Sequence, residues 1–205
     1  MNHNISVIFS KNPKERIPLL LNILYEYGIN QGKSVHLQSF DVNQSFYVNH
    51  LVSLISKIDF KLVESYMFPI DVKVQLKEKN IDSLEFVSAL EKIRTAQIKL
   101  SSSKPLTDES WLDYVFDLSS LKPFQVIIID NFGEFIDKSN KDIEVIMKTI
   151  EKYSKKYKCE IVLFINDKDL SKYSFPSWKV AHINEPLVFK YDSHNHNIVD
   201  IVEKE

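Results

Sequence analysis

The sequence is poor in glycine, cysteine and long apolar runs. Its three glycines, Gly28, Gly32 and Gly133, leave the first 27 residues without one. No glycine-rich loop that could close its backbone around a phosphate therefore stands near the N-terminus. The single cysteine, Cys159, excludes an intramolecular disulfide and a cysteine-based zinc site, and is typical of a reducing compartment.

No apolar run approaches the roughly 18 residues that cross a bilayer, and residues 1–11 lack the layout of a signal peptide. We therefore expect no membrane partner and a cytoplasmic location. The 205 residues, 44% hydrophobic and 26% charged, predict one ordinary domain over 1–205. A net charge of −2 gives no global signature of nucleic-acid binding, although a local basic patch remains open.

Short apolar runs alternate along the chain with segments of helical spacing. Strands are expected at 5–10, 34–40, 125–130 and 160–165, and a terminal hairpin at 187–191 and 198–202. Helices are expected at 17–27, around 48–55, and at 60–67, 83–93, 108–118 and 142–156; 72–76 is a candidate short strand and 101–107 a loop. Gly28 is expected to end the first helix. This alternation predicts an α/β fold with a mostly parallel, doubly wound sheet and a C-terminal antiparallel hairpin.

The stretch 125–130, QVIIID, is the most informative part of the chain. Its apolar run suits a strand buried on both faces of a parallel sheet, and Asp130 stands at the carboxyl end, where open α/β sheets place ligands. This is the layout of a Walker B strand, whose aspartate holds Mg²⁺ beside nucleotide phosphates. The alternative is an aspartate that merely ends the strand or caps a helix.

The order of five short segments matches one known family. They are 21–23 (LNI), 32–35 (GKSV), 39–41 (SFD), 126–132 (VIIIDNF) and 160–166 (EIVLFIN), followed by the terminal hairpin. In order and spacing they resemble the ATPase domain of DnaB-type replicative helicases, a RecA-like P-loop fold, over nearly the whole chain. The resemblance implies a DNA-replication role, with ATP and Mg²⁺ as the cofactors of an active member.

The resemblance places the phosphate loop at 11–17, KNPKERI, and most of its functional residues differ there. Glu15 falls at the glycine position, Arg16 at the catalytic lysine and Ile17 at the magnesium-binding threonine. Glu15 puts a negative charge where a phosphate would sit, a repulsion on the order of several kcal/mol at about 4 Å. Arg16 keeps a positive charge, whereas Ile17 has no hydroxyl for the metal.

At two further positions this chain has a shorter side chain than the family. Asp41 falls at the family's catalytic glutamate and could still polarise a water, although its surroundings are also ordinary helix-capping sequence. Asn166 falls at the sensor glutamine. The trans-acting basic residues of the family would fall near 203–205, which read Glu-Lys-Glu.

Three hypotheses remain. The favoured one is a degenerate, non-catalytic RecA-like domain (a pseudo-ATPase without an expected cofactor) that binds a helicase, a loader or a polymerase assembly. The alternative is an active ATP-dependent DNA helicase or ATPase, with Arg16 on phosphate, Asp130 on Mg²⁺ and Asp41 polarising water. The third is a scaffold in an unrelated process, where the likeness reflects fold alone. DNA contact and homo-oligomers stay open. The lysines at 152, 155, 156 and 158 fit either nucleic-acid phosphates or a solvated helix face.

Overall fold

The computed structural model describes the backbone of residues 4–10, 13–40, 42–66, 83–102, 124–139, 142–166, 179–182, 189–191 and 198–201. The expected helix at 108–118 and the candidate strand at 72–76 lie outside these ranges. No helix within the described part of the chain has the length and apolar character that a bilayer crossing requires.

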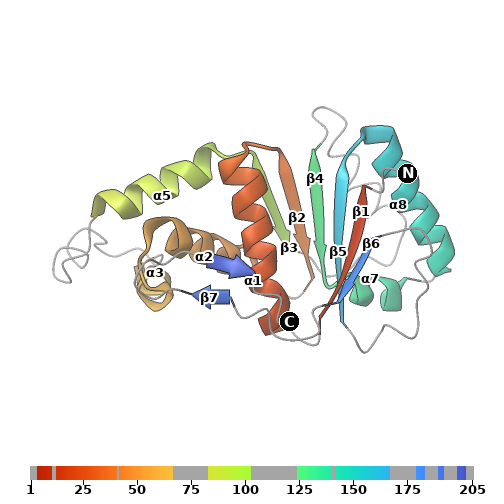
Figure 1. Ribbon diagram of the computed structural model, residues 1–205, viewed down its shortest axis with the longest axis horizontal. Helices are drawn as coiled ribbons and strands as arrows, with labels where there is room; N and C mark the ends of the chain where they lie inside the picture. The colour runs from red at the N-terminus through yellow and green to blue at the C-terminus, as the bar shows by residue number, and fades with distance from the viewer. Residues whose placement is uncertain are drawn as a thin grey trace.

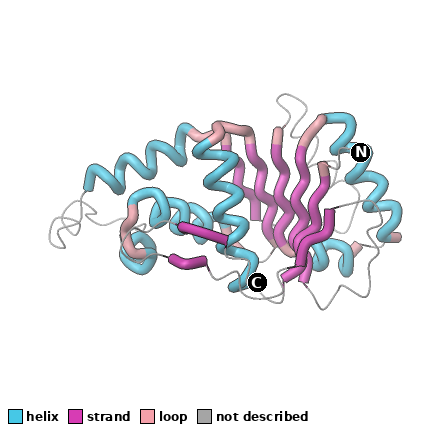
Figure 2. The backbone as a smooth tube through the Cα atoms, in the orientation of Figure 1, coloured by secondary structure: helices cyan, strands magenta, loops and turns pink. Residues whose placement is uncertain are grey.

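A six-stranded sheet in which every paired strand is parallel forms the centre of the molecule (Figure 2). The strand order is β3-β2-β4-β5-β1-β6. The strands are β1 (Ile5–Ser10), β2 (Val35–Ser39), β3 (Ile98–Ser102), β4 (Val126–Asp130), β5 (Glu160–Asn166) and β6 (Lys179–His182). The predicted α/β fold with a parallel sheet is thus confirmed, and 125–130 contains β4, one of its two central strands.

Helices cover both faces of the sheet (Figure 1). Alternate residues of β4 belong to different core clusters: Ile127 and Ile129 pack with α7 and α8, and Val126 and Ile128 pack with α1 and α2. A third cluster joins α2, α3 and α5. The helices are α1 (Pro13–Leu24), η1 (Tyr25–Asn30), α2 (Gln44–Ser56), α3 (Phe60–Tyr66), α5 (Ser83–Thr95), α7 (Phe132–Lys138) and α8 (Ile143–Tyr157).

The first helix differs from the prediction at both ends. It begins at Pro13 instead of residue 17, because a proline suits the first helical position, where its missing N–H costs no hydrogen bond. It does not end at Gly28 but continues to Asn30 as the π-helical segment η1. Gly28 is buried within that segment, and a Cβ there would lie 2.5 Å from the side chain of Ile98. Its role is therefore close packing against β3.

The prediction of a loop at 101–107 is wrong for its first two residues, because Ser101 and Ser102 belong to β3. This strand pairs with β2 over Val35–Ser39 and forms the edge of the sheet. Its residues are half-buried or exposed, so the sequence IKLSS lacks the apolar run that marks the central strands. The edge strand β6 was missed as well.

Two short strands, β7 (Phe189–Tyr191) and β8 (Ile198–Ile201), pair antiparallel as a separate sheet. They fall within the segments expected to form the terminal hairpin. The connecting residues 192–197 lie outside the described residues, so the complete hairpin stays a prediction.

Candidate functional site

Four neighbouring strands end in polar residues, which therefore lie together where the carboxyl ends of the strands meet. Ser39 ends β2, Asp130 ends β4, Asn166 ends β5 and Ser10 ends β1. Ser39 is in register with Asp130, and Ser10 with Asn166. The carboxyl ends of parallel strands therefore gather these side chains, as the position of Asp130 in the sequence predicts.

Arg16 reaches these strand ends from the first turns of α1. Its Nε donates a hydrogen bond to Oδ1 of Asp130 at 2.5 Å, and its Nη1 lies 3.4 Å from Oδ1 of Asn166. Only 1% of the Arg16 side chain and none of Asp130 is exposed. The arginine thus points inward to the strand ends and forms a buried ion pair.

The second oxygen of Asp130 is also occupied. Tyr47 of α2 donates its hydroxyl to Oδ2 at 2.8 Å, and the hydroxyl of Ser39 donates to the same oxygen at 3.1 Å. The hydroxyls of Tyr47 and Ser39 are themselves 3.2 Å apart, and Ser39 Oγ accepts the backbone N–H of Val42 at 3.1 Å. We call Arg16, Ser39, Tyr47, Asp130 and Asn166 the Asp130 cluster.

A row of polar contacts leads from the cluster to α7. Asn166 donates from Nδ2 to Oδ1 of Asn131 at 3.2 Å, and Asn131 donates from its own Nδ2 to Glu134 at 3.0 Å. Asn131 adopts a left-handed backbone with φ 55°, which asparagine tolerates better than most residues. This turn lets α7 begin directly after β4 and directs the Asn131 side chain towards β5.

Burial sets the electrostatics of the cluster. Removal from water, followed by the neighbouring charge of Asp130, raises the pKa of Tyr47 above its ordinary value, so that its hydroxyl stays a donor. A buried carboxylate is tolerated only when it is paired and its lone pairs are satisfied. Arg16, Tyr47 and Ser39 together meet both conditions for Asp130.

The residues present do not fit Mg²⁺ with a nucleotide. Magnesium requires carboxylate oxygens at about 2.0–2.1 Å in a near-octahedral shell. Both oxygens of Asp130 instead accept hydrogen bonds from protein groups, and the Arg16 guanidinium lies against one of them. A divalent cation at this carboxylate would have to displace those donors and remain beside a like charge. Within the described residues no three His, Cys, Asp or Glu side chains gather into a metal site.

The stretch that the resemblance aligned with a phosphate loop begins between β1 and α1. Only residues 11 and 12 separate Ser10 from Pro13. A Walker A sequence places four residues between its two glycines before the lysine. Residues 13–17 of the stretch that the resemblance aligned with that loop are instead helical.

The structure brings together three of the four predicted site residues, namely Arg16, Asp130 and Asn166. Asp41 lies outside the described residues. Tyr47 and Ser39 were missed as site residues. Tyr47 precedes an apolar helical stripe and resembles an ordinary core residue, while Ser39 is the last residue of a strand, a position that could have drawn attention to it.

Phe132 and Phe135 follow Asp130 on α7. Both are buried, with 0% and 3% of their surface exposed, and they stack with a ring separation of 5.8 Å. They therefore belong to the core between α7 and the sheet. Cys159 is also buried, which raises the pKa of its thiol to about 11.

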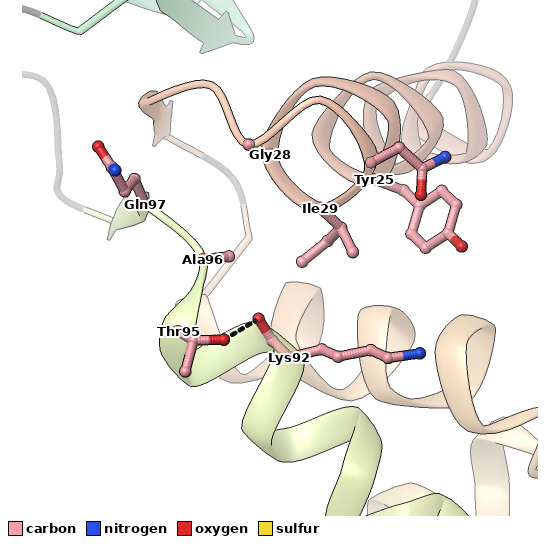
Figure 3. A pocket seen from close by; sticks show the side chains of 9 residues that line it. Tyr25, Gly28, Ile29, Lys92, Thr95, Ala96 and Gln97 are labelled. Carbon is pink, nitrogen blue, oxygen red and sulfur yellow. Dashed lines mark hydrogen bonds between the residues drawn. The ribbon is translucent and has the colours of Figure 1, made fainter.

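A hollow of about 460 Å³ lies between η1 and the end of α5 (Figure 3). It is near the amino ends of β2 and β3, where Gly28 approaches Val35 and Ile98, and so lies at the edge of the sheet opposite Asp130. Lys92 is the only charged side chain among its nine described lining residues, which include no carboxylate or histidine. Its described lining offers no acid–base pair for catalysis.

No protein-family model matches the chain, and no curated protein sequence matches it. Solved structures do. One of them, an ATPase domain, is 10% identical with a TM-score of 0.59, covering 84% of this chain and 60% of that one. A DnaB-like replicative helicase, whose structure was determined with its interactions with primase, is 10% identical with a TM-score of 0.61, covering 84% and 41%.

The flagellar accessory protein FlaH from Methanocaldococcus jannaschii is 14% identical with a TM-score of 0.50, covering 82% of this chain and 63% of that one. The chain spans less than two thirds of the length of each of these proteins. At such identities the likeness establishes the fold alone: the chain has a RecA-like fold. The expected likeness to DnaB-type helicase domains is confirmed at this level.

Proposed function

We propose that this protein is a non-catalytic RecA-like module that acts by binding other proteins of DNA replication. The observation that carries the proposal is the buried ion pair of Arg16 and Asp130 at the strand edge where RecA-like folds place their nucleotide. The guanidinium occupies the place that a metal ion would need beside Asp130. The cluster is therefore already satisfied without a ligand.

The energetics favour keeping the pair closed. Opening the site for a nucleotide would separate two buried charges and leave each without its partner, a change that costs about 3–5 kcal/mol where such pairs have been broken. Tyr47 and Ser39 would also lose their hydrogen bonds to the carboxylate. ATP and Mg²⁺ would have to compensate for all of this without a phosphate loop.

The proposed partner is a replicative helicase or an assembly that contains one, such as a helicase–loader or helicase–polymerase complex. The support is the fold, which this chain shares with a DnaB-like replicative helicase. A domain of the same fold without catalysis can use its subunit-contacting surfaces as a pseudo-subunit. The proposed location is the cytoplasm.

Isothermal titration of the purified protein with ATP and Mg²⁺ tests the catalytic part. We expect no heat of binding at millimolar nucleotide and no phosphate release. Measurable binding that Arg16→Ala or Asp130→Ala abolishes, while Arg94→Ala on the exposed face of α5 leaves it intact, would instead establish the alternative, an active ATPase with a divergent loop.

Biolayer interferometry with the purified replicative helicase from the same organism tests the partner. We expect saturable binding that persists without nucleotide. Failure to bind the helicase, alone and together with its loader or polymerase partner, would remove the replication role even if the nucleotide experiment came out as expected.

A further inference from the structure

The outer face of α8 and its C-cap carry five exposed lysines, which we call the lysine row: Lys148, Lys152, Lys155, Lys156 and Lys158. The opposite face of the helix is buried through Ile146, Met147, Ile150 and Ser154. Figure 1 shows α8 on the side of the sheet away from α5. We propose that the lysine row binds the phosphate backbone of a nucleic-acid strand without regard to sequence.

The spacing of the row produces a continuous line of positive charge. Lys148, Lys152 and Lys156 are four residues apart, so they succeed one another at about 6 Å along one face of the helix. Lys155 and Lys158 widen the line near the helix end. The whole chain carries a net charge of −2, so this concentration of one sign is local to α8.

Three of these five charges are not neutralised by an ion pair within the described part of the protein. Lys148 lies 3.6 Å from Glu144, and Lys156 lies over the ring of Tyr157 at 4.7 Å. Lys152, Lys155 and Lys158 form no ion pair with any residue that the structure describes. The acidic residues on the helix, Glu144 and Glu151, are outnumbered along this face.

Helix stability alone does not account for the row. Lysines in the last turn, here Lys155 and Lys156, are favourable because they oppose the negative end of the helix dipole. Lys148 and Lys152 lie outside that turn, and each successive pair among Lys148, Lys152 and Lys156 places like charges at i and i+4, which destabilises an isolated helix. A polyanion bound along the row would relieve this repulsion.

The surroundings favour a nucleic acid over other anionic partners. An amphipathic helix binds a lipid surface by burying its apolar face, but that face of α8 already packs in the core. The row contains lysines only, without the arginine fork that recognises one carboxylate or phosphate with two hydrogen bonds. Evenly spaced point charges suit a partner with a regular charge repeat, as phosphates provide.

Fluorescence anisotropy with a labelled oligo(dT) of about 20 nucleotides tests the proposal at about 50 and 200 mM salt. The variant is Lys152→Glu/Lys155→Glu. The matched control is Lys57→Glu/Lys61→Glu, which reverses the charge of two exposed lysines near α2 and α3. We expect the α8 variant to lose at least about tenfold in affinity, and the slope of log K against log salt to become shallower by roughly 1.4, or about 0.7 for each phosphate contact on a single strand.

Circular dichroism confirms that each variant is folded, and Lys152→Gln/Lys155→Gln replaces the α8 variant if the reversal is not tolerated. Equal losses in the variant and its control would overturn the proposal, as would no binding of the unaltered protein at the lower salt concentration. Binding of poly-glutamate as tightly as oligo(dT), with the same dependence on Lys152 and Lys155, would overturn it in favour of an acidic protein partner.

Discussion

Arg16 and Asp130 are joined by a hydrogen-bonded ion pair of 2.5 Å between Nε and Oδ1, and both side chains are buried. The arginine comes from the first helix and the aspartate from a central strand, 114 residues later. The pair therefore links α1 to the carboxyl edge of the sheet. In a nucleotide-binding relative the same edge would have to stay open for a ligand.

Replacing Arg16 by alanine tests how much stability this link supplies. The change leaves the Asp130 carboxylate buried without its partner, so we expect the free energy of unfolding to fall by about 3–5 kcal/mol. Urea denaturation followed by circular dichroism measures it. Arg94→Ala is the control, because Arg94 pairs with Glu91 at the surface, where 75% of its side chain is exposed, and its loss should change stability far less than the loss of Arg16.

The double variant Arg16→Met/Asp130→Leu removes both charges, so it distinguishes the contribution of the ion pair from the cost of leaving one buried charge without its partner. Because apolar side chains of similar volume need no partners, we expect it to recover much of the stability lost in Arg16→Ala. If Arg16→Ala were no more destabilising than Arg94→Ala, the Arg16–Asp130 pair would not be closed in solution.

Tyr47→Phe removes one hydrogen bond from the Asp130 carboxylate without removing the ring. A hydrogen bond to a charged group contributes about 1.5–3 kcal/mol, so we expect a loss of that size in urea denaturation. Tyr25→Phe is the matched control, since Tyr25 lies on η1 beside the hollow at the opposite edge of the sheet and should change stability by less than about 0.5 kcal/mol. Equal effects of the two changes would mean that the hydrogen bond from the Tyr47 hydroxyl to Asp130 does not contribute to the stability of the protein.

The central strands were predictable from sequence because each is a short apolar run buried on both faces, as in 126–130 and 160–165. The edge strand β3 was not, because IKLSS is half polar and is held in the sheet by pairing with β2. Asp130 was recognisable from its place after an apolar run. Its partners were not, because the contact of Arg16 and Tyr47 with Asp130 depends on how α1 and α2 pack over the sheet, which no local pattern encodes.

Gly28→Ala tests the close approach of η1 to β3. The added Cβ would lie 2.5 Å from Cδ1 and Cγ1 of Ile98, so we expect overpacking to cost about 1–3 kcal/mol in the free energy of unfolding. Ile98→Ala removes both atoms, and the double variant should be less destabilised than the sum of the two single changes. Strict additivity would show that Gly28 and Ile98 do not meet.

Gly32→Ala provides the comparison for Gly28. Gly32 has φ +63° and no atom within 4 Å of an added Cβ, so its substitution strains the backbone without a clash. We expect Ile98→Ala to leave the cost of Gly32→Ala unchanged. A rescue of both glycine variants by Ile98→Ala would point to general loosening of the sheet edge instead of a specific contact.

His36 predicts how stability depends on pH. It lies in β2 with no exposed surface, its Nε2 is 3.1 Å from Ser101 Oγ, and its Nδ1 has no hydrogen-bond partner among the described residues. Burial, and then the charge of Lys99, lowers the pKa of His36 from 6.5 to about 4. The folded protein therefore holds the ring neutral at pH values where the unfolded chain protonates it.

Above pH 6.5 the ring is neutral in both states, so His36 adds no pH dependence there. As the pH falls from 6.5 towards 4, His36 becomes protonated in the unfolded chain but stays neutral in the folded protein. The free energy of unfolding therefore falls by up to about 3 kcal/mol. Urea denaturation between about pH 7.5 and 4.5 measures the slope for the unaltered protein and for His36→Gln. We expect the slope to be shallower in the variant. Some slope remains because the variant retains His50, and burial also lowers the pKa of that histidine. Identical slopes would mean that His36 is accessible to protons in the folded protein, and that β2 does not exclude water at this position.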